Sequence, residues 1–368
     1  MNSAFKKPLI IIAFICAIPL VILLLVYITP IPPYAEVVKA RKTLSKAGQT
    51  KADTYSKELF AEAKSLYDSA MVSWQKENLR FIFVREYSRV EKFAKLSIKK
   101  AIQAKENSKL SSFSYKKKLK TKVNYLNSLA KDINTFFNRY PLSTDVRNKI
   151  ASGKMLLREG EICYRKGEFI PANRKLNDCE DLLSSAYDIA YYDLENYFKA
   201  YSQWEKWTKT AINESKRNQS YSIIVDKLSK KCIIYHNGIK KHEFDVELGR
   251  NWVGDKLKRG DKATPEGMYR IVSKLSRTKY NNALLIDYPN FEDKEKFHQA
   301  QSRGIIPKTA KIGGGIEIHG SGGKGVDWTE GCIALKDKEM EIVYNLASVG
   351  TPVTIVGSIR KLQQVFTR

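Results

Sequence analysis

The chain has 368 residues, enough for two domains with a substantial core, and its 64 Lys+Arg against 39 Asp+Glu give a formal net charge of +25. So basic a chain indicates anionic partners, although a solvated lysine-rich surface gives the same composition. Its five cysteines are too few for a disulfide scaffold, which excludes the small disulfide-rich class of secreted proteins.

The first predicted element is an apolar run over residues 9–28, about long enough at 1.5 Å per residue to cross a bilayer. Two lysines precede the run, so the positive-inside rule predicts a cytoplasmic N-terminus and places the rest of the chain outside. The run is long for a signal peptide, and Thr29–Pro33 offers no cleavage site. We expect a membrane anchor within residues 1–30, with a cleaved signal peptide as the alternative.

Residues 31–215 show helical rather than strand periodicity, because apolar side chains recur every three or four residues, as at Leu59, Ala63 and Leu66. Five or six helices are predicted, packed as antiparallel hairpins. We expect this region either to act as a spacer that extends from the membrane or to bind an envelope protein. The predicted breaks between helices lie near Gly48, Asn78, residues 107–114, Tyr140-Pro141 and residues 167–171.

Two cysteines, Cys163 and Cys179, flank the last of these predicted breaks. In an oxidising compartment they could bridge a helical hairpin. Two separate buried thiols fit the sequence equally well, so both alternatives stay open.

Near the C-terminus, His319 at a strand exit is followed within one loop by Cys332, which stands behind Gly331. A thiolate attacks carbonyls and an imidazole can take the thiol proton, so this pair suggests nucleophilic acyl chemistry. Taken separately, a lone cysteine is usually an inert buried residue and a lone histidine a satisfied polar one. The other histidines, His236, His242 and His298, show no metal-binding spacing with His319, so no metal site is expected. No cofactor is expected either.

The sequence around this pair resembles the L,D-transpeptidase (YkuD-type) catalytic domain over residues of about 220–357. The segments that carry the resemblance are His319-Gly320, Thr329–Leu335, Glu339-Met340 with Tyr344, Gly350–Ile355, the hairpin Tyr221–Asp226 and Lys231–Gly238, the strand Glu243–Gly249, and Ala263–Ile271 with its Thr-Pro-x-Gly turn.

Two departures from that family's pattern bear on the site. Members carry Ser-His-Gly-Cys-Ile-Arg, where this chain has Thr-Glu-Gly-Cys-Ile-Ala. Glu330 replaces the second histidine, so we expect a backbone carbonyl at that position to orient the imidazole. Ala334 removes a guanidinium that could bind a substrate carboxylate. The candidate substrate-binding residues are Lys324, Lys336 and Arg303 as replacements for the arginine, together with Gly320, Ser321, Thr329 and Glu330.

The resemblance implies a mechanism. Cys332 attacks the amide after the third residue of a peptidoglycan stem tetrapeptide, expels the terminal D-alanine and forms a thioester. His319 is the general base, and Gly331 lets the backbone bend so that nearby N–H groups face the oxyanion. An amine of another stem or of a protein then takes the acyl group. The alternatives are a carboxypeptidase or endopeptidase, in which water is the acceptor, and a non-catalytic wall-binding scaffold.

The predicted fold is therefore α+β, with a transmembrane helix, an all-α helical-hairpin region and a mainly β catalytic domain. The expected parts are residues 1–30, 31–215, 216–357 and a tail at 358–368. We expect a single-pass protein of the cytoplasmic membrane with its catalytic domain in the periplasm or cell-wall space. The expected partners are stem peptides and the membrane, and nucleic acid is not among them.

Overall fold

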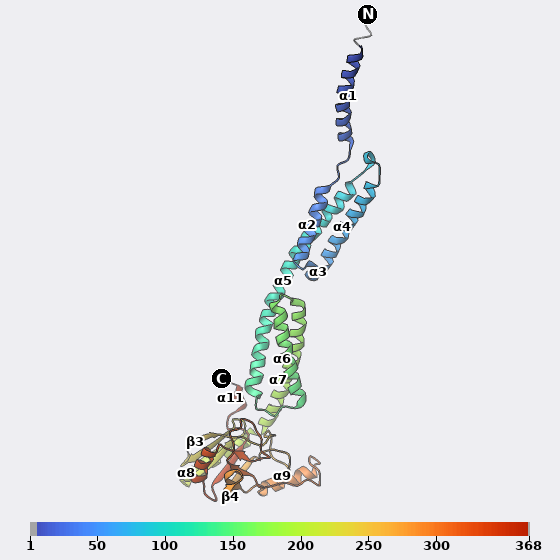
Figure 1. Cartoon of the computed structure of the whole chain (residues 1–368). Helices are drawn as coiled ribbons and strands as arrows, with labels where there is room; N and C mark the ends of the chain where they lie inside the picture. Colours follow the sequence, from blue (N-terminus) through green and yellow to red (C-terminus); the bar gives the residue numbers. More distant parts are fainter. Residues whose placement is uncertain (1–5, 367–368) are drawn as a thin grey trace. The chain divides into compact units, whose positions relative to one another are not determined.

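The computed structural model describes residues 6–366, and its elements follow one another along the chain as Figure 1 labels them. Internal contacts divide the chain into two compact units. The first, Met1–Val123 with Gly160–Arg174, is called the helical unit, and the second, Asn124–Glu159 with Lys175–Arg368, is called the sheet unit. These bounds group later helices with the sheet, and the domain boundary at residue 216 stays a prediction.

Alanine builds much of the core of the helical unit. Fully buried alanines from several helices meet there, which lets the helix backbones approach closely while keeping the highest helix propensity. The buried alanines of this cluster are Ala47, Ala52, Ala63, Ala101 and Ala104. These alanines come from α2 (Tyr34–Gln49), α3 (Ala52–Tyr55), α4 (Lys57–Asn78) and the first part of α5 (Ser88–Phe137). The short η1 (Ile82–Val84) connects α4 to α5.

The helix break predicted at residues 107–114 is wrong, because α5 continues through this segment. The serines and lysines there suggested a loop, but Ser108 is fully buried and its hydroxyl donates to the Thr50 carbonyl. Leu119 and Leu126 continue the buried stripe beyond it. Tertiary packing of one face therefore overrides the polar local composition.

The predicted membrane anchor is also wrong. The first helix, α1, runs over Lys6–Ile28, but in the part of the chain that the structure describes no helix is both long and apolar enough to cross a membrane. The transmembrane part of the predicted fold and the single-pass location are corrected accordingly.

The predicted α-helical region followed by a β domain is confirmed. One eight-stranded mixed sheet has the order β3-β2-β1-β8-β4-β5-β6-β7. Its strands are β1 (Tyr221–Asp226), β2 (Lys231–His236), β3 (Ile239–Asp245), β4 (Gly267–Thr278), β5 (Asn281–Ile286), β6 (Glu317–His319), β7 (Ile333–Ala334) and β8 (Pro352–Val356). The helices of the sheet unit and those it shares are α6 (Thr144–Arg165), α7 (Phe169–Tyr197), η2 (Phe198–Ala200), α8 (Tyr201–Arg217), α9 (Phe291–Ser302), α10 (Asp337–Leu346) and α11 (Leu362–Phe366).

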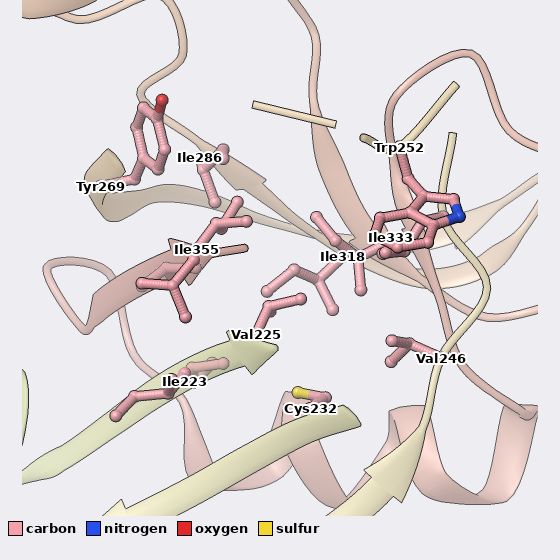
Figure 2. Close-up of a cluster of buried hydrophobic side chains, with 14 of the residues drawn as sticks. Ile223, Val225, Cys232, Val246, Trp252, Tyr269, Ile286, Ile318, Ile333 and Ile355 are labelled. Carbon is pink, nitrogen blue, oxygen red and sulfur yellow. The ribbon is translucent and has the colours of Figure 1, made fainter. Parts of the chain in front are cut away.

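Branched apolar residues of the central strands form the core of the sheet unit, as Figure 2 shows. Ile223, Ile318 and Ile355 each have at most 1 % of their surface exposed. Cys232 points its sulfur into the same core, where burial raises the pKa of its thiol to about 12. This cysteine is therefore an inert apolar residue rather than a second nucleophile.

A buried polar network ties α7 and α8 to the sheet. The ammonium of Lys227, fully buried after β1, donates to Glu266 Oε1 at 2.8 Å. The same carboxylate accepts from the Tyr197 hydroxyl at 2.6 Å and from the Trp204 indole at 2.9 Å. Removing one partner of such a network leaves a buried charge or polar group unsatisfied.

We predict that Tyr197→Phe lowers the free energy of unfolding by about 1.5–3 kcal/mol, the range for a hydrogen bond to a charged group. Urea denaturation followed by tryptophan fluorescence measures the change. The matched control is Tyr192→Phe on the same helix, where the side chain is 62 % exposed and the expected change is within about 0.5 kcal/mol. Equal stability of the two variants would contradict the role given to the network.

Candidate active site

The register of two short strands brings His319 and Cys332 to the same part of the sheet. β6 and β7 are parallel, with Ile318 opposite Ile333 and His319 opposite Ala334. Side chains alternate between faces along a strand, so Cys332, which directly precedes β7, falls opposite Glu317 and on the face that carries His319. The two predicted catalytic residues therefore lie on one face of neighbouring strands, although 12 residues separate them in the chain.

The imidazole of His319 is 1 % exposed, and its Nδ1 lies 2.7 Å from the Gly320 carbonyl oxygen. A carbonyl only accepts hydrogen bonds, so Nδ1 carries the proton of the neutral ring and Nε2 keeps the lone pair. Sequence reasoning expected a carbonyl at Glu330 to orient the ring. The carbonyl comes instead from Gly320, the next residue in the chain.

Two aromatic residues hold the imidazole in place, and sequence reasoning missed both. Tyr280 stacks on His319 with ring centroids 4.4 Å apart, and Trp328 meets it edge-on at 5.9 Å. The Trp328 indole donates to the buried carboxylate of Glu247 at 2.8 Å, so Glu247 orients the ring that contacts the histidine. Nothing in the local sequence of Tyr280 or Glu247 marks this role, since they reach the site only through the sheet.

The loop before Cys332 is closed by Thr329. Its hydroxyl donates to the Cys332 carbonyl at 2.8 Å and accepts from the Gly331 N–H at 3.2 Å. Gly331 has φ +134°, and a Cβ built on it would lie 2.6 Å from the Ala263 carbonyl oxygen. Only glycine fits this position, both for its backbone conformation and for the close approach of a second chain segment.

Burial shifts the pKa values of Cys332 and His319 so that the neutral thiol and the neutral imidazole are favoured over a thiolate–imidazolium ion pair. Burial raises the pKa of the Cys332 thiol, against the opposing effect of the Glu317 backbone hydrogen bond. Burial also lowers the pKa of His319, against the effect of the Gly320 carbonyl. Both shifts favour the neutral forms, so the resting site holds a thiol beside a neutral imidazole.

A cleft of about 510 Å³ opens beside the sulfur. Gly313, Gly314 and Gly315 form one wall, and the Gly315 carbonyl lies 3.8 Å from Cys332 Sγ. The remaining lining residues are Lys256, Arg259, Gly260, Ile316 and Glu330. The dimensions suit an extended peptide, and glycine walls let a peptide backbone approach closely.

The predicted substrate-binding residues are only partly brought together. Of that set, Glu330 lines the cleft. Lys324 lies over the Trp328 ring at 3.2 Å, on the histidine side of the site. Lys336 forms an ion pair with Glu339 at 3.7 Å. Arg303 is exposed at the C-terminal cap of α9 and does not line the cleft.

Two other predicted residues shape the turn after His319. Gly320 leaves no room for a side chain, because a Cβ there would lie 2.5 Å from Asp337 Oδ1 and 2.8 Å from the Tyr280 carbonyl oxygen. Ser321 has φ +62°, and its N–H donates to the same carboxylate at 2.7 Å. Their positions fix the path of the chain that leaves the histidine.

Residues 220–355 match the family model of YkuD, the L,D-transpeptidase catalytic domain. This part of the chain is therefore a YkuD-type L,D-transpeptidase catalytic domain, which confirms the resemblance seen in the sequence. No curated protein matches the chain.

Solved structures similar to this chain include Bd1075 of Bdellovibrio bacteriovorus, at 22 % identity and a TM-score of 0.30, over 40 % of this chain and 53 % of that one. An L,D-transpeptidase from Mycobacterium smegmatis matches at 13 % identity with a TM-score of 0.25, over 37 % of this chain and 58 % of that one. An L,D-transpeptidase from Mycobacterium tuberculosis H37Rv matches at 14 % identity with a TM-score of 0.26, over 37 % of this chain and 57 % of that one. The chain thus spans little more than half the length of each of these relatives.

We predict that Gly331→Ala slows alkylation of Cys332 by iodoacetamide at least severalfold, because the new Cβ must displace the Ala263 carbonyl or move the nucleophile loop. The matched control is Gly325→Ala in the same loop. Its φ of +77° is also left-handed, but no atom lies within 4 Å of the built Cβ. Mass spectrometry of the alkylated peptide measures the rates. If both variants slow alkylation equally, the cause is backbone strain in general and not the contact between position 331 and the Ala263 carbonyl.

Proposed function

We propose that the chain is a cysteine L,D-transpeptidase that acts on peptidoglycan stem peptides through a thioester on Cys332. The observation that carries the proposal is the adjacency of β6 and β7, with His319 and Cys332 on one face beside a cleft of peptide size. The family of the domain supports the substrate class. Bacterial cell-wall synthesis is the corresponding process.

The first half of the reaction transfers the acyl group to sulfur. Nε2 of His319 takes the thiol proton as Sγ bonds to the carbonyl carbon of the third stem residue. The carbonyl oxygen becomes an anion and then reforms the double bond as the C–N bond breaks. The D-alanine amine leaves with the proton that the imidazole held, and the enzyme keeps a thioester.

The oxyanion donor is the N–H of Cys332 itself in this proposal. The Gly331 N–H is already bonded to the Thr329 hydroxyl. The Cys332 N–H has no acceptor among the described residues, and Thr329 fixes the Cys332 carbonyl on the other side of the residue. A positioned donor of this kind is worth about 2.7–4 kcal/mol in acyl transfer.

The second half releases the acyl group. An acceptor amine, on another stem or on a protein, gives a proton to Nε2 and attacks the thioester, and the thiolate leaves and is reprotonated by the imidazole. Water in the same place gives a carboxypeptidase or endopeptidase. Mass spectrometry of wall fragments treated with the enzyme separates the two outcomes, because cross-linked stems report transfer and trimmed stems report hydrolysis.

We predict that Cys332→Ala abolishes turnover of a stem tetrapeptide and removes the acyl adduct seen by intact-protein mass spectrometry. Cys232→Ala is the control, because this thiol is fully buried in the core and cannot reach substrate. We expect it to keep most of the activity. An acyl adduct that persists in Cys332→Ala would contradict the thioester mechanism.

The pH dependence follows from the neutral pair. As the pH falls, His319 becomes protonated and can no longer accept the thiol proton, so kcat/KM should fall with a midpoint below about 6.5. Alkylation of free Cys332 should rise with a midpoint above that of an ordinary cysteine, because burial raises its thiol pKa. Kinetics with a stem tetrapeptide and iodoacetamide labelling from pH 4 to 10 measure both limbs.

The control for this profile is His319→Gln, which should lower kcat/KM by about 10²–10⁴ and remove the acid limb. A Cys332 alkylation midpoint near pH 5 that depends on His319 would instead reveal a resting thiolate–imidazolium pair. That outcome would contradict the neutral pair.

A further inference from the structure

The charge of the cleft beside Cys332 comes from one loop between β3 and β4. Residues 256–262 contain three lysines, one arginine and a single aspartate. Two of these basic residues, Lys256 and Arg259, line the cleft, while the facing wall consists of glycines without side chains. A basic wall of this kind next to a nucleophile favours an anionic group on the bound peptide.

Lys256 is a fixed cation in this wall. Its side chain is 4 % exposed, and its ammonium lies 2.6 Å from Asp261 Oδ1. The Asp261 carboxylate also accepts the backbone N–H groups of Leu257 at 2.8 Å, Lys258 at 2.9 Å and Ala263 at 3.1 Å. Asp261 therefore organises the loop from behind and is not among the residues that line the cleft.

Arg259 is exposed at the same cleft, and its backbone is held against the glycine wall. Its N–H donates to the Lys311 carbonyl at 2.7 Å, and a Cβ built on Gly313 would lie 3.4 Å from the Arg259 Cα. Among the residues from 6 to 366, no carboxylate forms an ion pair with its guanidinium. A planar guanidinium with a fixed backbone suits bidentate binding of a carboxylate.

The position that carries an arginine in the family's motif cannot supply this charge here. Ala334 is 1 % exposed and lies in the sheet between His319 and Glu247. The arginine position of the motif thus carries no cation in this chain, whereas the basic loop brings Lys256 and Arg259 to the cleft.

We propose that Lys256 and Arg259 bind a carboxylate of the donor stem peptide and determine the specificity of the cleft. This inference rests on the proposed function. The carboxylate has two sources: the C-terminal D-alanine that leaves, and the side chain of a diaminopimelate-type residue at the third position. Glu330, the acidic residue of the lining, would pair with an ammonium beside that carboxylate, as the end of a diaminopimelate side chain provides.

The test uses the purified full chain and synthetic stem tetrapeptides in a two-by-two design. The third residue is diaminopimelate or lysine, and the C-terminus is free or amidated. Release of D-alanine or its amide gives kcat and KM for each peptide. The variants are Arg259→Gln and the matched control Lys258→Gln, which removes a charge from the same loop at a residue that does not line the cleft.

We expect Arg259→Gln to lower kcat/KM about 10- to 100-fold, mainly through KM, for peptides that carry the recognised carboxylate. For the matched peptide without that carboxylate, kcat/KM of Arg259→Gln should stay within about twofold of the unaltered enzyme. For Lys258→Gln, kcat/KM should stay within about twofold for all four peptides. Loss of discrimination at the third residue identifies the side-chain carboxylate, and loss at the C-terminus identifies the D-alanine carboxylate.

The alkylation rate of Cys332 by iodoacetamide reports whether the site stays intact, and we expect it to be unchanged in Arg259→Gln. If the variant turns over all four peptides with the ratios of the unaltered enzyme, the inference is overturned while the proposed function stands. If the alkylation rate falls together with all four activities, the role of Arg259 is structural and the inference is also overturned. If the unaltered enzyme acts on no stem peptide, the proposed function itself fails.

Discussion

One buried ammonium governs the geometry of the catalytic domain. Nζ of Lys227 donates to the carbonyls of Gly254 and Thr264, each at 2.7 Å, and to the Glu266 carboxylate. The first two acceptors stand at the two ends of the basic loop that lines the cleft. A buried charge costs several kcal/mol unless its donors are satisfied, and here all three are. The loop is therefore closed at its base by an interaction that strongly resists opening.

The loop before Cys332 depends on the same segment. The Ala263 carbonyl, one residue before Thr264, is the atom that a side chain at Gly331 would meet. Because the Lys227 ammonium fixes Thr264, it indirectly fixes the surface against which the loop before Cys332 packs. The Thr-Pro-x-Gly turn thus has a structural meaning in this chain: its variable residue is Glu266, the anion that balances Lys227, and the turn supports both the cleft and the nucleophile.

The histidine has an independent support, and this difference explains what the sequence could reveal. The motif around His319 and Cys332 is local, so the family, the thiol and the imidazole were predictable, as was the helical region before the β domain. The contacts of Tyr280, Trp328 and Glu247 depend on pairing between distant strands, which one sequence does not encode in any local pattern.

The prediction for residues 107–114 failed for a related reason. Ser108 has a polar side chain, but it is fully buried and donates a hydrogen bond to the Thr50 carbonyl. Likewise, proximity in the chain suggested Lys324, Lys336 and Arg303 as carboxylate ligands, whereas the cleft takes its cations from residues some 75 positions before the nucleophile.

The departure at Ala334 gains a physical explanation from this arrangement. The residue sits in β7 opposite His319 and forms backbone hydrogen bonds with Glu247 in both directions, at 2.8 and 2.9 Å. Glu247 in turn orients Trp328 against the imidazole. A guanidinium at position 334 would bring a long charged side chain into a nearly solvent-free site beside the base, where it would further disfavour protonated histidine and compete for the Glu247 carboxylate. With alanine there, β7 carries no charged side chain, and the two basic residues that line the cleft stand on a loop that the Lys227 ammonium closes at its base. Lys256 and the residues that hold His319 are thus fixed by different hydrogen bonds, to Asp261 in the loop and to Gly320 at the end of β6.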